Sequence, residues 1–199
     1  MTQDSSDATP TTRPPDGPDY EALKALFLKI RRLKDAVGAN KISFYRPHEK
    51  QRNFHAAERA DIRVVLGGNR SGKTTCGAVE ALAHSLGERP WLAVDDPNRL
   101  VRLPNGDPIQ VPNIGRIVAN TFEINIVQTI HPKIMEWAPA GSITSIQKNP
   151  RGVPIRYDFS NGSVVYLMSY DQDVESFEGP NGHWFWCDEP PPQRIFNGL

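Results

Sequence analysis

The sequence predicts an α/β domain with a doubly wound, mostly parallel sheet, and three observations lead to this prediction. A short β-branched apolar run at residues 62–66 ends in glycines, and a helical pattern at residues 75–86 follows closely. A second strand pattern at residues 116–120 is followed by a helical pattern that reaches about Met135. A last apolar strand occupies residues 183–187. Strand and helix alternating along a chain are typical of such a sheet.

Length and charge limit the possible classes of protein. The chain has 199 residues, which is enough for one well-packed domain. Its 23 Lys and Arg residues balance 23 Asp and Glu residues, so a contact with nucleic acid would have to be local. The longest strongly apolar stretch, residues 164–168, is too short to span a bilayer, and the N-terminus lacks a signal-peptide pattern. We expect a soluble, non-secreted protein in which Cys76 and Cys187 are reduced thiols.

The chain is predicted to divide into a tail, a lead-in helix and a core. Residues 1–19 are rich in Ser, Thr, Asp and Pro and are predicted to be disordered. Residues 20–40 are predicted to form an amphipathic helix that ends at Gly38, with Lys and Arg opposite the apolar side. The basic face is interpreted as solvated surface, with a contact to DNA or to a partner as the alternative. The apolar positions of this helix are Leu23, Leu26, Phe27, Ile30 and Leu33.

Two more segments of the core, residues 41–199, have recognisable patterns. Residues 90–113 contain several prolines and an Asn105-Gly106 turn, so we predict an inserted loop or hairpin without chemistry. Residues 155–159 and 163–170 flank a Ser-Asn-Gly turn and predict a β-hairpin.

A phosphate-binding motif carries the strongest functional signal. The glycines let backbone N–H groups converge on phosphate oxygens, and the following helix presents its positive end. Lys73 is expected to reach the β- and γ-phosphates, and the Thr74 hydroxyl to bind Mg²⁺. The motif predicts a P-loop NTPase with ATP and Mg²⁺ as ligands, and no other metal is predicted. Its residues are Gly67, Gly68, Asn69, Arg70, Ser71, Gly72, Lys73 and Thr74, with Thr75 next in the helix.

An acidic doublet supplies what hydrolysis requires. The apolar strand at residues 183–187 leads into Asp188 and Glu189, a Walker B pattern. Asp188 is predicted to bind the Mg²⁺ shell, and Glu189 to act as the general base that polarises the attacking water. The doublet favours an ATPase of the ASCE/RecA-like group over a kinase. The aromatic residues of the strand are expected to pack in the core.

These motifs together resemble the ATPase domain of tailed-phage large terminases. The resemblance begins at residues 44–55, continues through the P-loop, and extends to the strand and Asp-Glu-Pro sequence at residues 184–190. In that family an aromatic and proline segment followed by a glutamine recognises adenine. The resemblance therefore implies this role for Tyr45, Pro47 and Gln51.

The resemblance also implies a function and partners. It implies a motor that hydrolyses ATP and translocates double-stranded DNA into a capsid, as a homo-oligomeric ring in the cytoplasm of a bacterial host. The expected partners are double-stranded DNA, a small terminase subunit and a portal protein. Two alternatives remain open: another P-loop enzyme, such as a helicase-like ATPase or a kinase, and a non-catalytic nucleotide-binding module.

The sequence departs from the family pattern at two places. Arg70 stands one position from the usual P-loop arginine, and Glu178 stands where a second arginine is common, so the source of an arginine finger is open. Arg70 is the candidate cation for the γ-phosphate. The chain ends at Leu199, ten residues after Glu189, so we expect a sheet that is incomplete at its C-terminal end and no nuclease domain. ATP binding is a safer expectation than rapid turnover.

Overall fold

The computed structural model of the chain describes residues 19–177 and 182–197, and the predicted disordered tail lies outside them. The chain forms two compact units, Met1–Ala36 and Val37–Leu199. The helix α1 (Tyr20–Ala39) makes up the described part of the first unit and continues into the second. Asp19 caps it, because the Asp19 carboxylate accepts hydrogen bonds from the N–H groups of Glu21 and Ala22. The predicted helix is confirmed, except that Gly38 lies inside its last turn.

The second unit contains the sheet and the remaining helices. Its short helices include two 3₁₀-helices, η1 and η3, and one π-helix, η2. In chain order the elements are η1 (Lys41–Phe44), α2 (Glu49–Ala56), α3 (Lys73–Leu86), β1 (Ile114–Ala119), η2 (Phe122–Ile130), α4 (His131–Trp137), β2 (Ile143–Lys148), β3 (Pro154–Phe159), β4 (Val164–Ser169), η3 (Val174–Ser176), β5 (Trp184–Asp188) and α5 (Gln193–Phe196).

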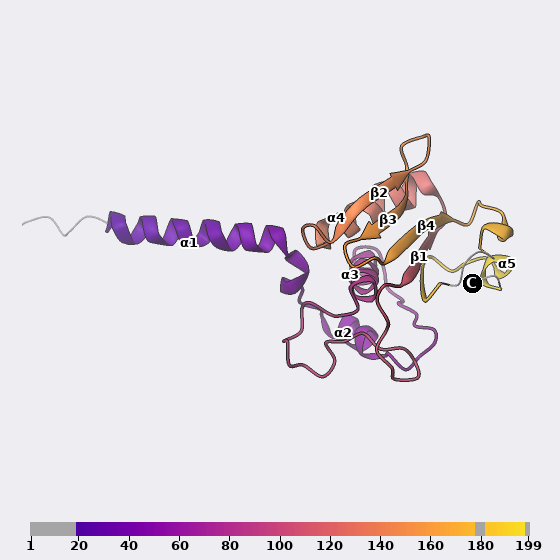
Figure 1. The fold of residues 1–199 in the computed structure, drawn as a ribbon, viewed down its shortest axis with the longest axis horizontal. Coiled ribbons are helices and arrows are strands. Elements are labelled where there is room, and N and C mark those ends of the chain that lie inside the picture. The colour runs from indigo at the N-terminus through magenta and orange to yellow at the C-terminus, as the bar shows by residue number, and fades with distance from the viewer. Residues whose placement is uncertain (1–18, 178–181, 198–199) are drawn as a thin grey trace, which may run out of the picture. The chain divides into compact units, whose positions relative to one another are not determined.

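The sheet is mixed, which corrects the prediction of a mostly parallel one. Its five strands run in the order β2-β3-β4-β1-β5 (Figure 1). β1 pairs in parallel with both β4 and β5, whereas β3 pairs antiparallel with β2 and β4. The predicted hairpin is confirmed as β3 and β4, and a tight hairpin is antiparallel by construction. The sequence prediction also missed β2, which adds a second antiparallel pair.

The predicted strand at residues 62–66, here called the pre-loop segment, is not formed. Its backbone has no strand assignment, and the side chains of Ile62, Val64 and Leu66 are 64%, 71% and 86% exposed. The physical reason is that the segment pairs with no strand: β5 is the last strand of the sheet among the described residues, and its outer edge is left unpaired. An extended segment without a neighbour has no ladder in which to satisfy its backbone groups.

The two faces of the sheet are covered differently. On one face α3 contacts β1 and β5, and α4 contacts α3 and η2. Their apolar side chains, among them Val79, Leu82 and Ile134, form the main core with Ile117 and Leu167 of the sheet. The opposite face has a smaller cluster, which consists of Val118, Met168, Tyr170, Phe177 and Ile195. The main core therefore lies between the sheet and the helix that follows the P-loop.

The helical pattern after β1 is divided between a π-helix and an α-helix. In η2 the N–H of Ile126 donates to the carbonyl of Thr121, five residues back. The pattern changes to α at His131, where Pro132, which has no N–H to donate, lies in the first turn of α4.

Two further predictions from the sequence concern the cysteines and the absence of a membrane span. Cys76 and Cys187 are both free thiols, as predicted. Among the described residues, no helix combines the length and apolar character needed to cross a bilayer.

Candidate functional site

The P-loop is a tight turn between the pre-loop segment and α3. Gly72 adopts a φ of +82° at the N-cap of α3, and Arg70 adopts a φ of +62°, which is uncommon for a residue with a side chain. A Cβ atom on Gly67 would lie 2.6 Å from the Ser71 hydroxyl oxygen, so the loop closes on itself where glycine stands. The loop conformation therefore favours glycine at Gly67, because a side chain would meet Ser71, and at Gly72, because its φ is positive.

The first turn of α3 offers free hydrogen-bond donors. The first hydrogen bond of this helix runs from the N–H of Cys76 to the carbonyl of Gly72, at 2.9 Å. Within the described part of the chain, the N–H groups of Lys73, Thr74 and Thr75 have no acceptor, and no side chain caps the helix. Unpaired N–H groups at the positive end of a helix are a favourable place for anionic oxygens.

The ammonium group of Lys73 lies over the loop that precedes it. It donates to the carbonyl oxygens of Gly67 at 2.8 Å and Gly68 at 2.9 Å. The same side chain lowers the pKa of Asp188 through its charge, so the lysine and the carboxylate are close enough to interact. The structure therefore brings together the two sequence motifs, which are more than a hundred residues apart.

Asp188 is the last residue of β5 and pairs in register with Ala119 of β1. Burial and the charge of Glu189 raise the pKa of Asp188, while Lys73 and a hydrogen bond from Asn125 partly offset the increase. The Asn125 side-chain oxygen accepts from the Thr121 hydroxyl at 3.1 Å, which leaves the amide NH₂ to face the carboxylate. Sequence reasoning missed Asn125, because nothing in its neighbourhood resembles a motif.

Glu189 is held by its backbone rather than by its side chain. Its φ of +86° is strained for a residue that is not glycine, and its carbonyl accepts a hydrogen bond of 2.8 Å from the Tyr170 hydroxyl. Its side chain is exposed. Glu189 is therefore exposed at the end of β5, in contrast to the half-buried Asp188.

Two tryptophans fix the position of β5. A Cβ atom on Gly77 of α3 would lie 2.4 Å from the Trp186 ring, and one on Gly115 of β1 would lie 2.0 Å from the Trp184 ring. The indole N–H of Trp184 also donates to the Asn113 side-chain oxygen at 3.1 Å. These contacts set the distance between the P-loop helix and the strand that ends in Asp188, and they agree with the prediction that the aromatic residues pack in the core.

The residues assigned to adenine recognition lie in two environments. Gln51 is buried beside the P-loop: its Nε2 donates to the Gly72 carbonyl at 3.3 Å, and its Oε1 accepts from the N–H of His48 at 3.1 Å. Tyr45 is buried in the core, and its hydroxyl lies 3.2 Å from Nε2 of His55. Pro47 is half-buried. In this structure the Gln51 amide supports the loop backbone, and the Tyr45 ring packs inside the domain.

A buried charge cluster around Glu80 connects the pre-loop segment to α3. Oε1 of Glu80 lies 2.8 Å from Arg63 and 3.4 Å from Arg89, and its Oε2 lies 2.6 Å from Nδ1 of His55. Burial alone would raise the pKa of Glu80, but the His55 hydrogen bond and the charges of His84 and Arg63 outweigh it and hold the pKa low. Sequence reasoning missed this cluster, although an acidic residue within the apolar run of α3 was a usable signal.

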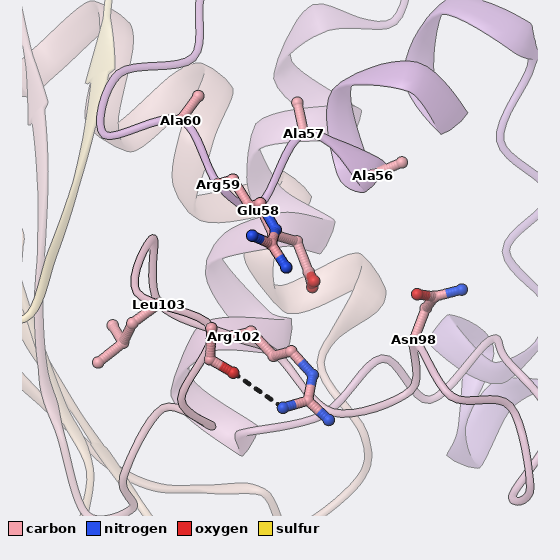
Figure 2. Close-up of a pocket in the computed structure, with 9 residues that line it drawn as sticks. Ala56, Ala57, Glu58, Arg59, Ala60, Asn98, Arg102 and Leu103 are labelled. Atoms are coloured by element: carbon pink, nitrogen blue, oxygen red, sulfur yellow. Dashed lines mark hydrogen bonds between the residues drawn. The ribbon is translucent and has the colours of Figure 1, made fainter.

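A cavity of about 680 Å³ has Glu58, Arg102 and Asn98 in its lining (Figure 2). None of the predicted site residues lines it. Two of its charged groups are already engaged, since Glu58 contacts Arg89, and Arg102 donates to the carbonyl of Gly106 at 2.9 Å. The cavity is lined by residues 56–60 at the end of α2 and by the inserted loop, and we assign it no chemistry.

Arg70, the candidate γ-phosphate cation, is exposed on the loop. Glu178, the second departure from the family pattern, lies outside the described residues. No cluster of three or more His, Cys, Asp or Glu side chains that could hold a metal occurs within the described ranges. A cation at this site would therefore depend on Thr74, Asp188 and oxygens supplied by a ligand.

Comparison with known proteins gives one family. Residues 64–197 match the family model described as terminase large subunit, T4likevirus-type, N-terminal. The match includes the P-loop and the Asp188-Glu189 doublet, but not α1 or the residues assigned to adenine. No curated protein and no solved structure matches the chain.

Proposed function

The chain belongs to the N-terminal family of the T4-like terminase large subunit, and we propose that it is the ATP-binding and hydrolysing motor domain of this DNA-packaging enzyme. Terminase large subunits are generally ATPases, which supports the proposal. The observation that carries it is the approach of Lys73 to Asp188, beside a helix start whose N–H groups are free.

The proposed site fits a nucleotide with Mg²⁺. The free N–H groups of Lys73, Thr74 and Thr75 would bind phosphate oxygens, and Lys73 would exchange its carbonyl acceptors for them. The Thr74 hydroxyl and Asp188 would hold Mg²⁺, which neutralises charge on the transferring phosphoryl group. The half-buried carboxyl of Asp188, whose pKa is raised in the protein alone, would gain a compensating cation.

Glu189 is the proposed general base. It follows Asp188 directly at the end of β5, and it is exposed where Asp188 is half-buried. A carboxylate at this place can accept a proton from a water that attacks the terminal phosphorus. Arg70 is the proposed cation for the γ-phosphate, and Gln51 the proposed adenine contact beside the loop.

The wider proposal follows the family. It is that the fold is of the P-loop NTPase type, that hydrolysis drives double-stranded DNA through a ring of subunits, and that a portal protein and a small terminase subunit are partners. The place of action is then the cytoplasm of the bacterial host.

The test compares nucleotide binding and ATP turnover, with and without duplex DNA, in the wild type and in two variants. We expect Lys73→Ala to lose ATP binding, and Glu189→Gln to retain binding but lose turnover. Lys148→Ala, a surface lysine on β2 at the far edge of the sheet, is the control and should behave as the wild type. Equal ATP affinity in the wild type and Lys73→Ala would reject the site.

One observation favours a second candidate, a nucleotide-binding module without turnover. The pre-loop segment leading into the P-loop is outside the sheet, so no strand among the described residues supports the loop from that segment. In that case ATP binds and is lost in Lys73→Ala, while neither the wild type nor any variant hydrolyses it, with or without DNA.

A further inference from the structure

Within the described residues of its own unit, the helix α1 carries an apolar stripe that nothing covers. No residue of this 20-residue helix is buried. Four apolar side chains follow one another at spacings of three, four and three residues, and each is between 42% and 54% exposed. They are Leu23, Leu26, Ile30 and Leu33, which we call the α1 stripe.

The spacing of the α1 stripe is that of a coiled-coil seam. Alternating steps of three and four residues give a seven-residue repeat, in which Leu23 and Ile30 occupy the a positions and Leu26 and Leu33 the d positions. Such a repeat keeps one narrow seam facing a partner helix, where side chains insert between those of the neighbour. A lipid surface imposes no such order, because any wide apolar face serves it.

The charges beside the α1 stripe define the partner. The helix carries five cations and only two carboxylates. Lys29 stands at a g position and Lys34 at an e position, the two positions that flank the seam and meet the partner's charges. Two copies of α1 would bring these lysines toward each other in a parallel pair, and like charges there destabilise the pair. Charge complementarity therefore disfavours a second copy and favours an acidic helix.

We infer that α1 is a docking helix that pairs, through the α1 stripe, with an amphipathic helix of another protein carrying acidic residues beside its own apolar seam. This inference is independent of the nucleotide site, because α1 lies outside the family match and contains none of the proposed ATP residues. The partner is recognised by its apolar repeat and its negative flanks together.

The experiment uses the full chain and two labelled synthetic peptides of three heptads. Both have Ile at a and Leu at d; one has Glu at every e and g position, and the other has Lys there. We expect fluorescence anisotropy to show the acidic peptide binding at least about tenfold more tightly than the basic one, with the difference shrinking as salt rises. Equal binding of the two peptides, or no binding of either, overturns the inference.

Variants separate the seam from the rest of the helix. Leu26→Asp should abolish binding of the acidic peptide, whereas Leu28→Asp, at an exposed position outside the stripe, should leave it unchanged. Exchanging Lys29 and Lys34 together for Glu should reverse the preference toward the basic peptide, and this variant retains the apolar seam. Loss of binding in Leu28→Asp, or an unchanged preference after the double exchange, contradicts the inference.

Other occupants give distinct results. Sedimentation of the chain alone reports self-association. A dimer that dissociates in Leu26→Asp would identify the partner of the α1 stripe as a second copy of the chain and would overturn the inference. Co-sedimentation with phosphatidylserine vesicles that depends on the α1 stripe would identify the partner as a lipid surface. A gel shift of duplex DNA that depends on the stripe would identify it as nucleic acid. The inference is supported if the chain is a monomer, binds the acidic peptide selectively, and shows no binding of vesicles or DNA that depends on the α1 stripe.

Discussion

The pre-loop segment and β5 are similar in sequence and differ in structure. Both are short apolar runs that lead directly into residues of the proposed nucleotide site. β5 pairs with β1, and Trp184 and Trp186 pack against glycines of β1 and α3. The pre-loop segment pairs with nothing in the described part of the chain, and its apolar side chains face solvent. An apolar run becomes a strand only where its backbone hydrogen-bonds to a neighbouring strand.

The difference has a consequence for the two halves of the site. Asp188 is positioned by a strand that pairs with β1. The P-loop is positioned by side chains: Gln51 donates to the Gly72 carbonyl, and Arg63 of the pre-loop segment contacts the buried Glu80 of α3. The loop therefore depends on side-chain contacts, where β5 depends on a hydrogen-bonded ladder.

The largest expected effect is the loss of a β5 anchor. Trp184→Ala should lower the free energy of unfolding by about 4 kcal/mol, because it removes a buried ring and its hydrogen bond to Asn113. Leu66→Ser removes an exposed apolar side chain from the pre-loop segment and should alter the free energy of unfolding by less than about 0.5 kcal/mol. Urea unfolding measures both. A large loss of stability in Leu66→Ser would mean that the pre-loop segment is packed in solution, and it would contradict the difference described between this segment and β5.

Next in size is the removal of the pre-loop anchor. Glu80→Ala should cost about 3 kcal/mol, because it leaves the largely buried Arg63 without a carboxylate and removes one of the two carboxylates that Arg89 contacts. The low pKa of Glu80 means that its contribution is present above the pKa of the unfolded chain and declines as the pH falls through the folded value. The deficit of Glu80→Ala should therefore shrink at strongly acidic pH. Glu88→Ala, in the more exposed pair with Arg99, is the control and should be close to neutral. A small effect of Glu80→Ala would show that the cluster does not anchor the segment.

A smaller effect is expected from crowding the sheet. Gly115→Ala places a methyl group where the Trp184 ring lies and should cost about 2 kcal/mol through displacement of that ring. Gly38→Ala meets no neighbour within 4 Å and should not destabilise the protein. Thermal unfolding followed by near-ultraviolet circular dichroism reports both. A neutral Gly115→Ala would indicate that β5 moves freely relative to β1.

The smallest effect is electrostatic. The pKa of Asp188 is raised in the folded protein, so the folded state binds its proton more readily than the unfolded state does. Stability therefore falls as the pH rises from the ordinary aspartate value through the raised one, and Asp188→Asn should remove that decline. Urea unfolding at several pH values is the measurement, with Asp61→Asn at an exposed position as the control. Parallel pH profiles of Asp188→Asn and the wild type would contradict the assigned shift.

Sequence reasoning predicted the elements whose signals are local. The turn between β3 and β4, the apolar run of β5 and the helix after the P-loop are each encoded within a few residues of themselves, and all three are present. It missed β2, because Ser145 and Gln147 give this exposed edge strand no apolar alternation. It predicted a strand in the pre-loop segment because the apolar pattern of a run carries no information about whether the run pairs with a neighbouring strand.

The same distinction between local and long-range signals applies to the residues of the candidate site. The motif residues could be found because phosphate binding requires them at fixed spacing, and the structure brings Lys73 close to Asp188. Asn125 and Glu80 could not be assigned, since their roles depend on contacts with residues far along the chain. The buried position of Tyr45 likewise follows from packing against Trp91 and Trp137 rather than from its neighbours in sequence.

The contact of Trp186 with Gly77 has an optical consequence. The indole lies against the P-loop helix while its backbone stands two residues before Asp188, so it joins the two halves of the proposed nucleotide site. Indole emission shifts in wavelength and intensity when the polarity around the ring changes. A displacement of α3 relative to β5 would therefore alter the emission of the protein, so the intrinsic fluorescence reports the spacing of the two halves of the proposed site without an attached dye.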